Sequence, residues 1–297
     1  MFKLVKLIPI KTNFRIMRYA RILSVIGLLL VASSAALAWQ SGFNWGIDFS
    51  GGVQIEVKTA EKANLETMRR DLAEFSPTIQ TVGDTGDIVS IYIGGDNQDE
   101  NALNTRMADV KRILGDGVEY RNIQVVGPKV GSELKRDGVI AVILAILVMT
   151  LYIGIRFELP YAIGIGLSLI HDVIVALGLI ALARYQFDLV LLAALLTLAG
   201  YSINNTVVIY DRIRENMRKY KGKELGDIID MSINETFSRT VLTSTTTIIA
   251  VSAIYLYGGQ ALRGFSGIML FGVVIGTYSS VFLSTSTLLL FRKKLLK

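Results

Sequence analysis

The charged residues of this chain are gathered into a few segments, and this clustering constrains its fold more than any other feature. Crossing a bilayer as a helix takes about 20 mainly apolar residues. Six segments meet that requirement: 22–39, 138–155, 161–183, 189–209, 241–257 and 265–290. The mean hydropathy of +0.48 agrees with this reading. The sequence therefore predicts a polytopic α-helical membrane protein with six spans.

The spans divide the chain into a simple predicted order. These parts are a basic N-terminal segment 1–21, a first span 22–39, a polar domain with its linkers 40–136, a five-helix bundle 137–291 containing a polar connection 211–240, and a basic tail 292–297. Lys and Arg collect in the N-terminal segment, the connection and the tail, which predicts that these three face the cytoplasm. The polar domain is then expected on the outer side of the membrane.

The rare residue types exclude several classes of site. The 297 residues include no cysteine and one histidine, His171. This composition excludes disulfides, zinc thiolates and multi-histidine metal sites. No paired aspartates lie within the spans, so we expect neither an enzyme nor a cofactor. The net charge of +6 indicates contact with anionic lipid headgroups rather than with nucleic acid.

The first span has an alternative interpretation. A basic start, an apolar run and then Ala36-Leu37-Ala38 are also typical of a cleavable signal peptide. The apolar run is long for that role, which favours a retained anchor. Cleavage would leave the rest of the topology unchanged.

The polar domain carries alternating strand and helix patterns. The expected order is a strand at 53–58, a helix at 61–75, strands at 79–83 and 87–95 joined by a turn at 84–87, a helix at 100–114 and a strand at 117–127. This β-α-β-β-α-β order predicts a small α+β sandwich of the ferredoxin-like type. The fold alone says little about function, and we expect the domain to make contacts rather than perform chemistry.

Two glycine-containing segments flank that domain. WGIDFSGG (45–52) places Asp48 among apolar residues before Gly51 and Gly52, and GPKVGSELKRDG (127–138) contains Gly127 and Gly131. We expect both segments to be connections between membrane and domain that act as hinges. A single aspartate in such a turn is more often a backbone cap than a catalytic acid.

The third span contains an ionisable pair, His171-Asp172. Asp172 follows Tyr161 by 11 positions, which is about 16 Å along a helix and close to the bilayer centre. Charged groups at that depth are costly unless they are paired, so each is a functional candidate. Asp172 is a candidate for binding and releasing a proton. The alternative is a structural aspartate bonded to Ser or Thr of a neighbouring helix.

Further polar residues occur in the later spans. Asn204 and Asn205 lie near the end of the fourth span, before Asp211 and Arg212, and Arg239 opens the Ser/Thr-rich fifth span, SRTVLTSTTT. Together with Asp172 they could line a polar track for ions. Such hydroxyls can equally serve helix packing, as can Gly272 and Gly276 in the sixth span. From these residues alone, the chain is a transporter-like membrane protein.

Several long blocks of the sequence resemble those of bacterial SecF proteins. They are FNWGIDFSGGVQIEV, VGPKVGSEL, HDVIVALG, AGYSINNTVVIYDRIRENMR and TFSRTVLTSTTT, in the family's order over about residues 15–292. The resemblance implies a six-span subunit, half of a unit of the RND type, in the inner membrane. It also implies pairing with SecD, action beside the SecYEG channel and YajC on a translocating preprotein, and a proton as the coupling ion.

The resemblance also assigns residues. Arg239 matches the family's functional arginine, Asp172 its HDV acid, and Asp48, Gly51 and Gly52 its glycine signature. The family's fourth-span block usually reads GYSIND, whereas this chain has Asn205 in place of the intramembrane aspartate. An amide cannot titrate. Three explanations stay open: natural variation with coupling through Asp172 or acids of SecD, an introduced neutral substitution, or a weakly coupled homologue.

Other functions were weighed against protein export. An RND-like exporter of lipid or small hydrophobic molecules would predict activity without SecD and a deep apolar substrate pocket. This chain has half the usual number of RND spans, which argues against its working alone. An intramembrane enzyme lacks candidate catalytic groups. A purely structural scaffold for the channel is the remaining alternative.

Overall fold

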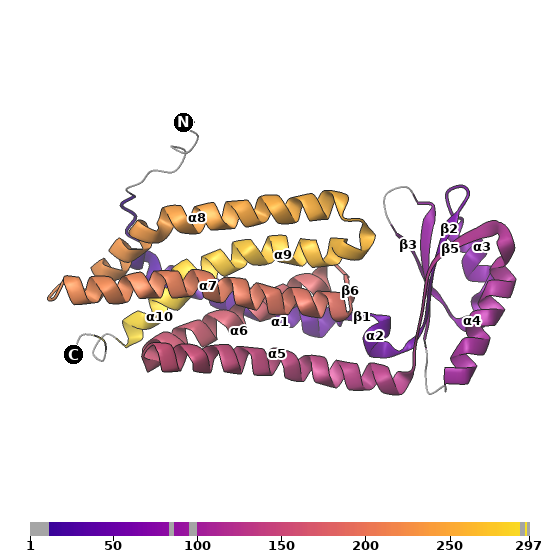
Figure 1. The fold of residues 1–297 in the computed structure, drawn as a ribbon, viewed down its shortest axis with the longest axis horizontal. Coiled ribbons are helices and arrows are strands. Elements are labelled where there is room, and N and C mark those ends of the chain that lie inside the picture. The colour runs from indigo at the N-terminus through magenta and orange to yellow at the C-terminus, as the bar shows by residue number, and fades with distance from the viewer. Residues whose placement is uncertain (1–11, 83–85, 95–99, 292–294, 296–297) are drawn as a thin grey trace. The chain divides into compact units, whose positions relative to one another are not determined.

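The computed structural model describes residues 12–82, 86–94, 100–291 and 295, and the chain forms two compact units (Figure 1). A helical unit comprises residues 1–43, 142–185 and 190–297, and a sheet-containing unit comprises residues 44–141 and 186–189. One unit is helical and the other contains a sheet, because the long apolar segments suit lipid and the charged segments suit water.

Among the described residues, six helices are long and apolar enough to span a membrane, which agrees with the predicted number. Their elements are α1 (Ala20–Ser41), α5 (Pro128–Arg156), α6 (Leu159–Leu182), α7 (Leu189–Lys219), α8 (Leu225–Tyr257), and a last span made of α9 (Gln260–Tyr278), a π-helical segment (Ser279–Ser284) and α10 (Thr285–Leu290). Glycine marks the end of α1, because Gly42 adopts φ 61°, a conformation that other residues resist.

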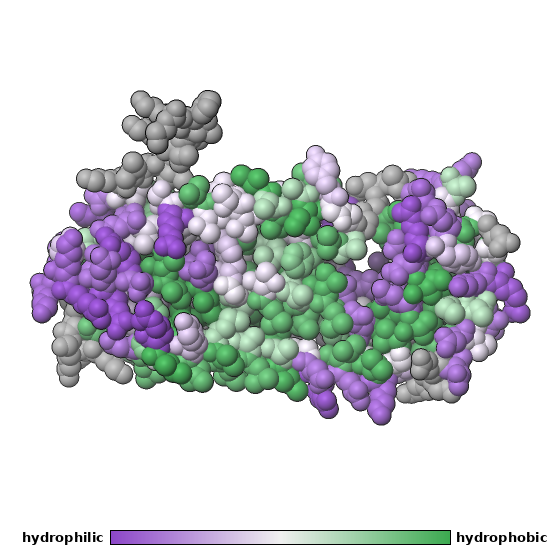
Figure 2. Space-filling model, viewed as in Figure 1, coloured by the Kyte–Doolittle hydropathy of each residue, from purple (hydrophilic) through white to green (hydrophobic). Residues whose placement is uncertain are grey.

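The central helix of the helical unit is α6. In its most apolar stretch 67% of the residues are buried, against 11% in α1 and in α5. Hydrophobic side chains cover the outer helices, and hydrophilic ones gather at the end that holds the α7–α8 connection (Figure 2). A bilayer accepts such exposed apolar faces because the helices satisfy their own backbone groups.

Small residues set the close helix contacts. A Cβ added at Gly178 of α6 would lie 2.3 Å from the Cβ of Ser34 in α1, and one at Gly272 of α9 would lie 2.5 Å from Leu198 in α7. The glycine pair of the sixth span thus permits close approach to α7, as predicted.

One end of the helical unit collects the basic segments. The backbone N–H of Met17 donates to Asp230 of α8, and Met17 packs against a buried cluster that includes Leu225 and Leu295. The N-terminal segment, the α7–α8 connection and the end of the last span therefore lie together, as the charge pattern requires of three segments on one side of a membrane.

The second unit has the predicted β-α-β-β-α-β order. Its elements are β2 (Gly52–Thr59), α3 (Leu65–Asp71), β3 (Thr78–Val82), β4 (Ile88–Gly94), α4 (Glu100–Leu114) and β5 (Val118–Val126). The antiparallel sheet has the order β3-β4-β2-β5. Its core comprises alternate residues of the central strands, such as Val53, Ile55 and Ile91, with Leu72 and Leu103 from the helical segments. The ferredoxin-like prediction is confirmed.

Two predicted connections are helical for much of their length. The segment GPKVGSELKRDG was expected to be a linker, but α5 already begins at Pro128, because a proline at the first helical position sacrifices no hydrogen bond. The polar connection 211–240 consists of the end of α7 and the start of α8, with a turn between Lys219 and Leu225. Residues 84 and 85 of the predicted turn, residue 83 at the end of the strand before it, residues 1–11 and most of the basic tail lie outside the described residues.

The two glycine segments of this unit touch each other. A Cβ at Gly131 would lie 2.9 Å from the backbone N of Gly51, and one at Gly51 would lie 2.8 Å from the Cα of Pro128. Gly51 also adopts φ 69°, which favours glycine. Gly127 has no atom within 4 Å of such a Cβ. That these segments act as hinges stays a prediction, and their observed role is close backbone packing.

This packing predicts unequal effects of alanine at the two glycines of 127–131. Gly131→Ala should lower the stability of the full chain by about 1–3 kcal/mol, because backbone atoms that face the new methyl group cannot move aside easily. Gly127→Ala should be nearly neutral. The apparent melting temperature of each purified variant in detergent, followed by intrinsic tryptophan fluorescence, measures the difference. Equal melting temperatures would contradict the packing role.

Candidate functional site

A buried carboxylate, Asp172 of α6, lies at the centre of the helical unit and has no exposed surface. Its Oδ1 lies 2.9 Å from His171 Nδ1. Its Oδ2 accepts hydrogen bonds from Ser202 Oγ of α7 at 2.5 Å and from Ser279 Oγ of the last span at 2.7 Å. Three helices therefore meet at one side chain, which is the pairing that an acid inside a membrane requires.

Hydroxyl groups extend this network along α7 and the π-helical segment. Ser168 Oγ donates to Ser279 Oγ at 3.0 Å, and Thr206 Oγ1 donates to Ser280 Oγ at 2.8 Å. Ser280 Oγ in turn donates to the backbone O of Ser202 at 3.2 Å. The π-helical turn begins at the residue that bonds Asp172, and π-turns of this kind are frequent at functional sites.

The arrangement can respond to a proton. An ionised carboxylate only accepts hydrogen bonds, whereas a protonated one must also donate. Proton binding would therefore require Ser202, Ser279 or His171 to change its hydrogen-bonding role. The same bonds are those that a structural aspartate would make to serines of neighbouring helices. The geometry is thus compatible with a proton-binding role and with a structural role for Asp172. His171 is a buried partner of this acid.

The two neighbouring asparagines of α7 face different surroundings. Asn205 is 4% exposed, and its Nδ2 has no hydrogen-bond partner within the described part of the chain. It lies in the turn that also contributes Ser202 and Thr206 to the hydroxyl network. Asn204 is exposed, on an adjacent face of the helix. Only Asn205 of this pair therefore belongs to the interior.

The fifth span contributes less to the interior than its composition suggests. Arg239 is exposed, as are Thr245 and Thr246. Thr240 and Ser244 of this run are buried. Ser244 accepts a hydrogen bond from Tyr201 at 3.0 Å and lies 2.9 Å from Thr277 Oγ1, whereas Thr240 donates to the backbone O of Thr236 in its own helix. The continuous track predicted from Asp172 to Arg239 is therefore divided into an interior cluster around Asp172 and an exposed polar surface.

Asp48 acts as a backbone cap, as its sequence context favoured. It follows β1 (Asn44–Trp45), which pairs in parallel with β6 (Gln186–Phe187). Its Oδ2 accepts a hydrogen bond at 3.0 Å from the backbone N–H of Leu189, where α7 begins. The rings of Trp45, Phe49 and Phe187 pack beside it. The glycine signature is thereby fixed to the start of the helix that later carries Asn205.

The polar end of α7 is joined to α8 by an ion pair and hydrogen bonds. Arg212 donates to Glu215 and to Glu235, each at 2.6 Å, and the buried Asn216 donates to Glu235 at 2.7 Å. Asp211 is exposed. These contacts hold the two long helices together beyond their apolar parts.

The described residues contain no candidate metal site, and the serines around Asp172 are functional candidates that the sequence did not reveal. Among the described residues, no group of three His, Asp or Glu side chains is placed to hold a metal ion. The serines that bond Asp172 and extend its network, Ser202, Ser279 and Ser280, were not predicted. Their signal was present in the run SSVFLSTST of the sixth span, but hydroxyls are ordinary in spans.

Comparisons with known proteins agree with one another. Residues 107–294 match the family "Protein export membrane protein SecD/SecF, C-terminal", and residues 37–63 match "SecD/SecF GG Motif". The protein translocase subunit SecF of Rickettsia bellii is 40% identical over 296 residues, covering 97% of each chain. That of Rickettsia felis is 40% identical over 294 residues, covering 97% of this chain and 95% of the relative.

Two solved structures of SecDF are also similar. The crystal structure of SecDF, a translocon-associated membrane protein from Thermus thermophilus, superposes with a TM-score of 0.86 at 30% identity over 97% of this chain. SecDF in a super-membrane-facing form gives a TM-score of 0.70 at 30% identity over 95% of this chain. This chain spans 40% and 39% of the lengths of those two chains.

The network around Asp172 predicts a stability cost for one hydroxyl. Ser279→Ala should destabilise the helical unit by about 1–2 kcal/mol, because it removes a donor from a buried carboxylate. Thr246→Ala is the matched control, since the exposed Thr246 bonds only to carbonyls of its own helix. Thermal unfolding of the full chain in detergent compares the two. Equal stability of both variants would show that Asp172 gains little from Ser279.

Proposed function

The chain belongs to the SecD/SecF family of protein-export membrane proteins, and we propose that it acts as a SecF-type subunit that uses proton movement to assist export. Its match to SecF relatives along almost the whole chain supports the export role. The one observation that carries the proton coupling is Asp172, a buried carboxylate bonded to three helices of a membrane bundle.

The proposed coupling works through the hydrogen bonds of that carboxylate. When Asp172 is ionised, Ser202 and Ser279 donate to it and hold α7 and the last span against α6. When it binds a proton, the carboxyl must donate, and Ser202, Ser279 or His171 must become the acceptor. The π-helical turn at Ser279–Ser284 supplies backbone that can rearrange. Binding and release of the proton would then change how the helices pack. Asn205, which cannot titrate, would contribute hydrogen bonds only.

The glycine signature offers a route from the spans to the outer domain. Asp48 caps α7 at Leu189, and α7 also supplies Ser202. A displacement of α7 along its axis would therefore act on residues 45–52, which lead into β2. We propose that this connection conveys the change at Asp172 to the ferredoxin-like unit, which would act on a translocating preprotein directly or through a partner.

The exposed polar surface of α7 and α8 supports a membrane partner. Thr197, Gly200 and Asn204 lie exposed on one stripe of α7, and Arg239 is exposed on α8. Polar groups on a span are costly against lipid and suit contact with another protein. We propose that SecD covers this face, with SecYEG and YajC as further partners. We propose that the chain is a multi-pass inner-membrane protein with both termini in the cytoplasm and residues 40–136 in the periplasm.

The proton role of Asp172 is testable in a reconstituted system. In vesicles containing SecYEG, SecD and this chain, Asp172→Asn should reduce preprotein translocation to the level seen without a proton gradient, because an amide cannot release a proton. The matched variant Asn205→Asp adds an acid at the family's usual position. Comparing both single variants with the double variant separates the two positions.

Each outcome of that cycle bears on the proposal. A rise in gradient dependence with Asn205→Asp would show that position 205 is a second proton site that this chain has neutralised. Recovery of gradient dependence in the double variant would place the coupling acid at either position. If the Asp172→Asn variant responded to the gradient as the unmodified chain does, the proton site would lie in SecD rather than at Asp172.

The partner face is testable because the chain contains no cysteine. Single cysteines at Thr197, Gly200 and Asn204 should cross-link to cysteines placed in the SecD spans. Leu147→Cys and Leu151→Cys are controls, since these α5 residues are 57% and 64% exposed on an apolar face. Cross-linking from α5 but not from α7 would contradict the assignment.

A further inference from the structure

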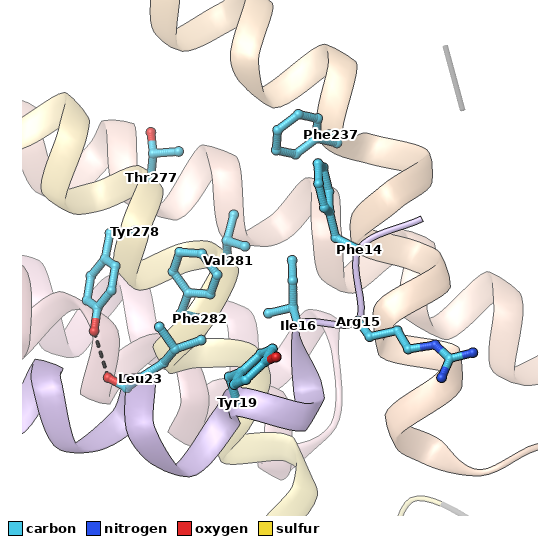
Figure 3. Close-up of a pocket in the computed structure, with 10 residues that line it drawn as sticks. All are labelled: Phe14, Arg15, Ile16, Tyr19, Leu23, Phe237, Thr277, Tyr278, Val281 and Phe282. Carbon is cyan, nitrogen blue, oxygen red and sulfur yellow. Dashed lines mark hydrogen bonds between the residues drawn. The ribbon is translucent and has the colours of Figure 1, made fainter. Parts of the chain in front are cut away.

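An apolar cavity of about 620 Å³ lies where the N-terminal segment meets α1, α8 and the last span (Figure 3). The segment before α1 supplies Phe14, Arg15, Ile16 and Tyr19, and α1 supplies Leu23. The opposite wall comes from α8 and the last span, including Phe237, Tyr278, Val281 and Phe282. This volume is in the range of small-molecule sites, and the network around Asp172 does not use it.

Two hydroxyls in the wall, those of Thr277 and Tyr278, are already engaged within the protein. Tyr278 donates to the backbone O of Leu23 at 2.6 Å, drawn as a dashed line in Figure 3. Thr277 donates to the backbone O of Val273 at 2.7 Å. The remaining lining of the interior is mainly aromatic and aliphatic carbon. A polar occupant would lose its water without gaining partners there, so the cavity suits an apolar chain.

The N-terminal wall of the cavity is held in place. Asn234 of α8 accepts a hydrogen bond from the backbone N–H of Phe14 at 2.8 Å and donates to its carbonyl at 2.8 Å. The ring of Phe14 meets that of Phe237 edge to face, with centroids 5.4 Å apart. Asp230 accepts from the N–H of Met17. The cavity is therefore preformed, which lowers the cost of binding.

The rim of the cavity is basic and aromatic. Arg15 extends away from the cavity in Figure 3, with its guanidinium on the outer side of the rim. Tyr19 is 52% exposed, and the Arg18 guanidinium lies 6.0 Å from its ring centre. Tyrosine and arginine at the end of a span are typical of the membrane–water interface. Basic side chains at that level attract anionic headgroups.

We propose that this cavity binds one acyl chain of an anionic membrane phospholipid, whose headgroup lies at Arg15 and Arg18 in the leaflet on the N-terminal side. The bound chain would lie between the N-terminal segment and the last span. It would contact Tyr278, the residue before Ser279. The lipid site is independent of the export proposal, because it rests on the cavity and its rim alone.

Photo-cross-linking with a lipid probe tests this site in the full chain, reconstituted with SecD. The probe is a phosphatidylglycerol with a diazirine in its acyl chain, and labelled peptides are identified by mass spectrometry. Label should concentrate on peptides containing Phe237 and Val281. Leu23→Trp, which fills the cavity, should lower that label several-fold. Val25→Trp should not, because Val25 is 55% exposed on α1 outside the cavity.

The headgroup part is tested by competition. Unlabelled phosphatidylglycerol should displace the probe from the unmodified chain better than phosphatidylcholine does. Arg15→Gln should remove that preference, and Arg21→Gln, an exposed arginine outside the lining, should preserve it. The unmodified chain makes this arm independent of how the Trp variants fold. Three results would each overturn the proposal: label spread evenly over the spans, equal competition by both lipids, or a cross-link to SecD from the cavity.

Discussion

A buried carboxylate in a membrane bundle is the constraint from which much of this structure follows. Asp172 has no exposed surface, so its charge and lone pairs must be satisfied by protein groups. His171 supplies one contact from its own helix, and Ser202 and Ser279 supply the others from α7 and the last span. To bring those short side chains within reach, the three helices must pack closely, and small residues at their interfaces allow this.

Close packing then determines which faces are left for lipid and partners. Gly276 of α9 lies against Ser202, and Gly272 lies against Leu198, so α7 and the last span meet next to Asp172. The faces turned away differ in character. That of α5 is apolar, whereas that of α7 carries Asn204 and other small or polar residues. The polar interior and this exposed polar surface are thus adjacent faces of one helix.

The sequence predicted the elements well and the faces of its helices poorly. Six spans and the ferredoxin-like order follow from periodicity and charge, which are local properties. The direction of each side chain depends on how a helix is rotated, so the sequence does not distinguish the exposed Asn204 from the buried Asn205. For the same reason the sequence does not show that Arg239 lies apart from Asp172. Ser279 cannot be singled out from sequence, because a serine in a span gives no sign of its partner.

The orientation of α7 also explains why an amide at position 205 leaves a candidate proton site in the bundle. Asn205 lies one residue before Thr206, which bonds Ser280, and three residues after Ser202, which bonds Asp172. A carboxylate at position 205 would therefore stand beside a network that already contains an acid. With an amide there, Asp172 is the acid left in the described part of this network. Its hydroxyl donors connect it to α7 and to the last span, so in the coupling we propose a proton at Asp172 would act on these contacts without a second acid at position 205.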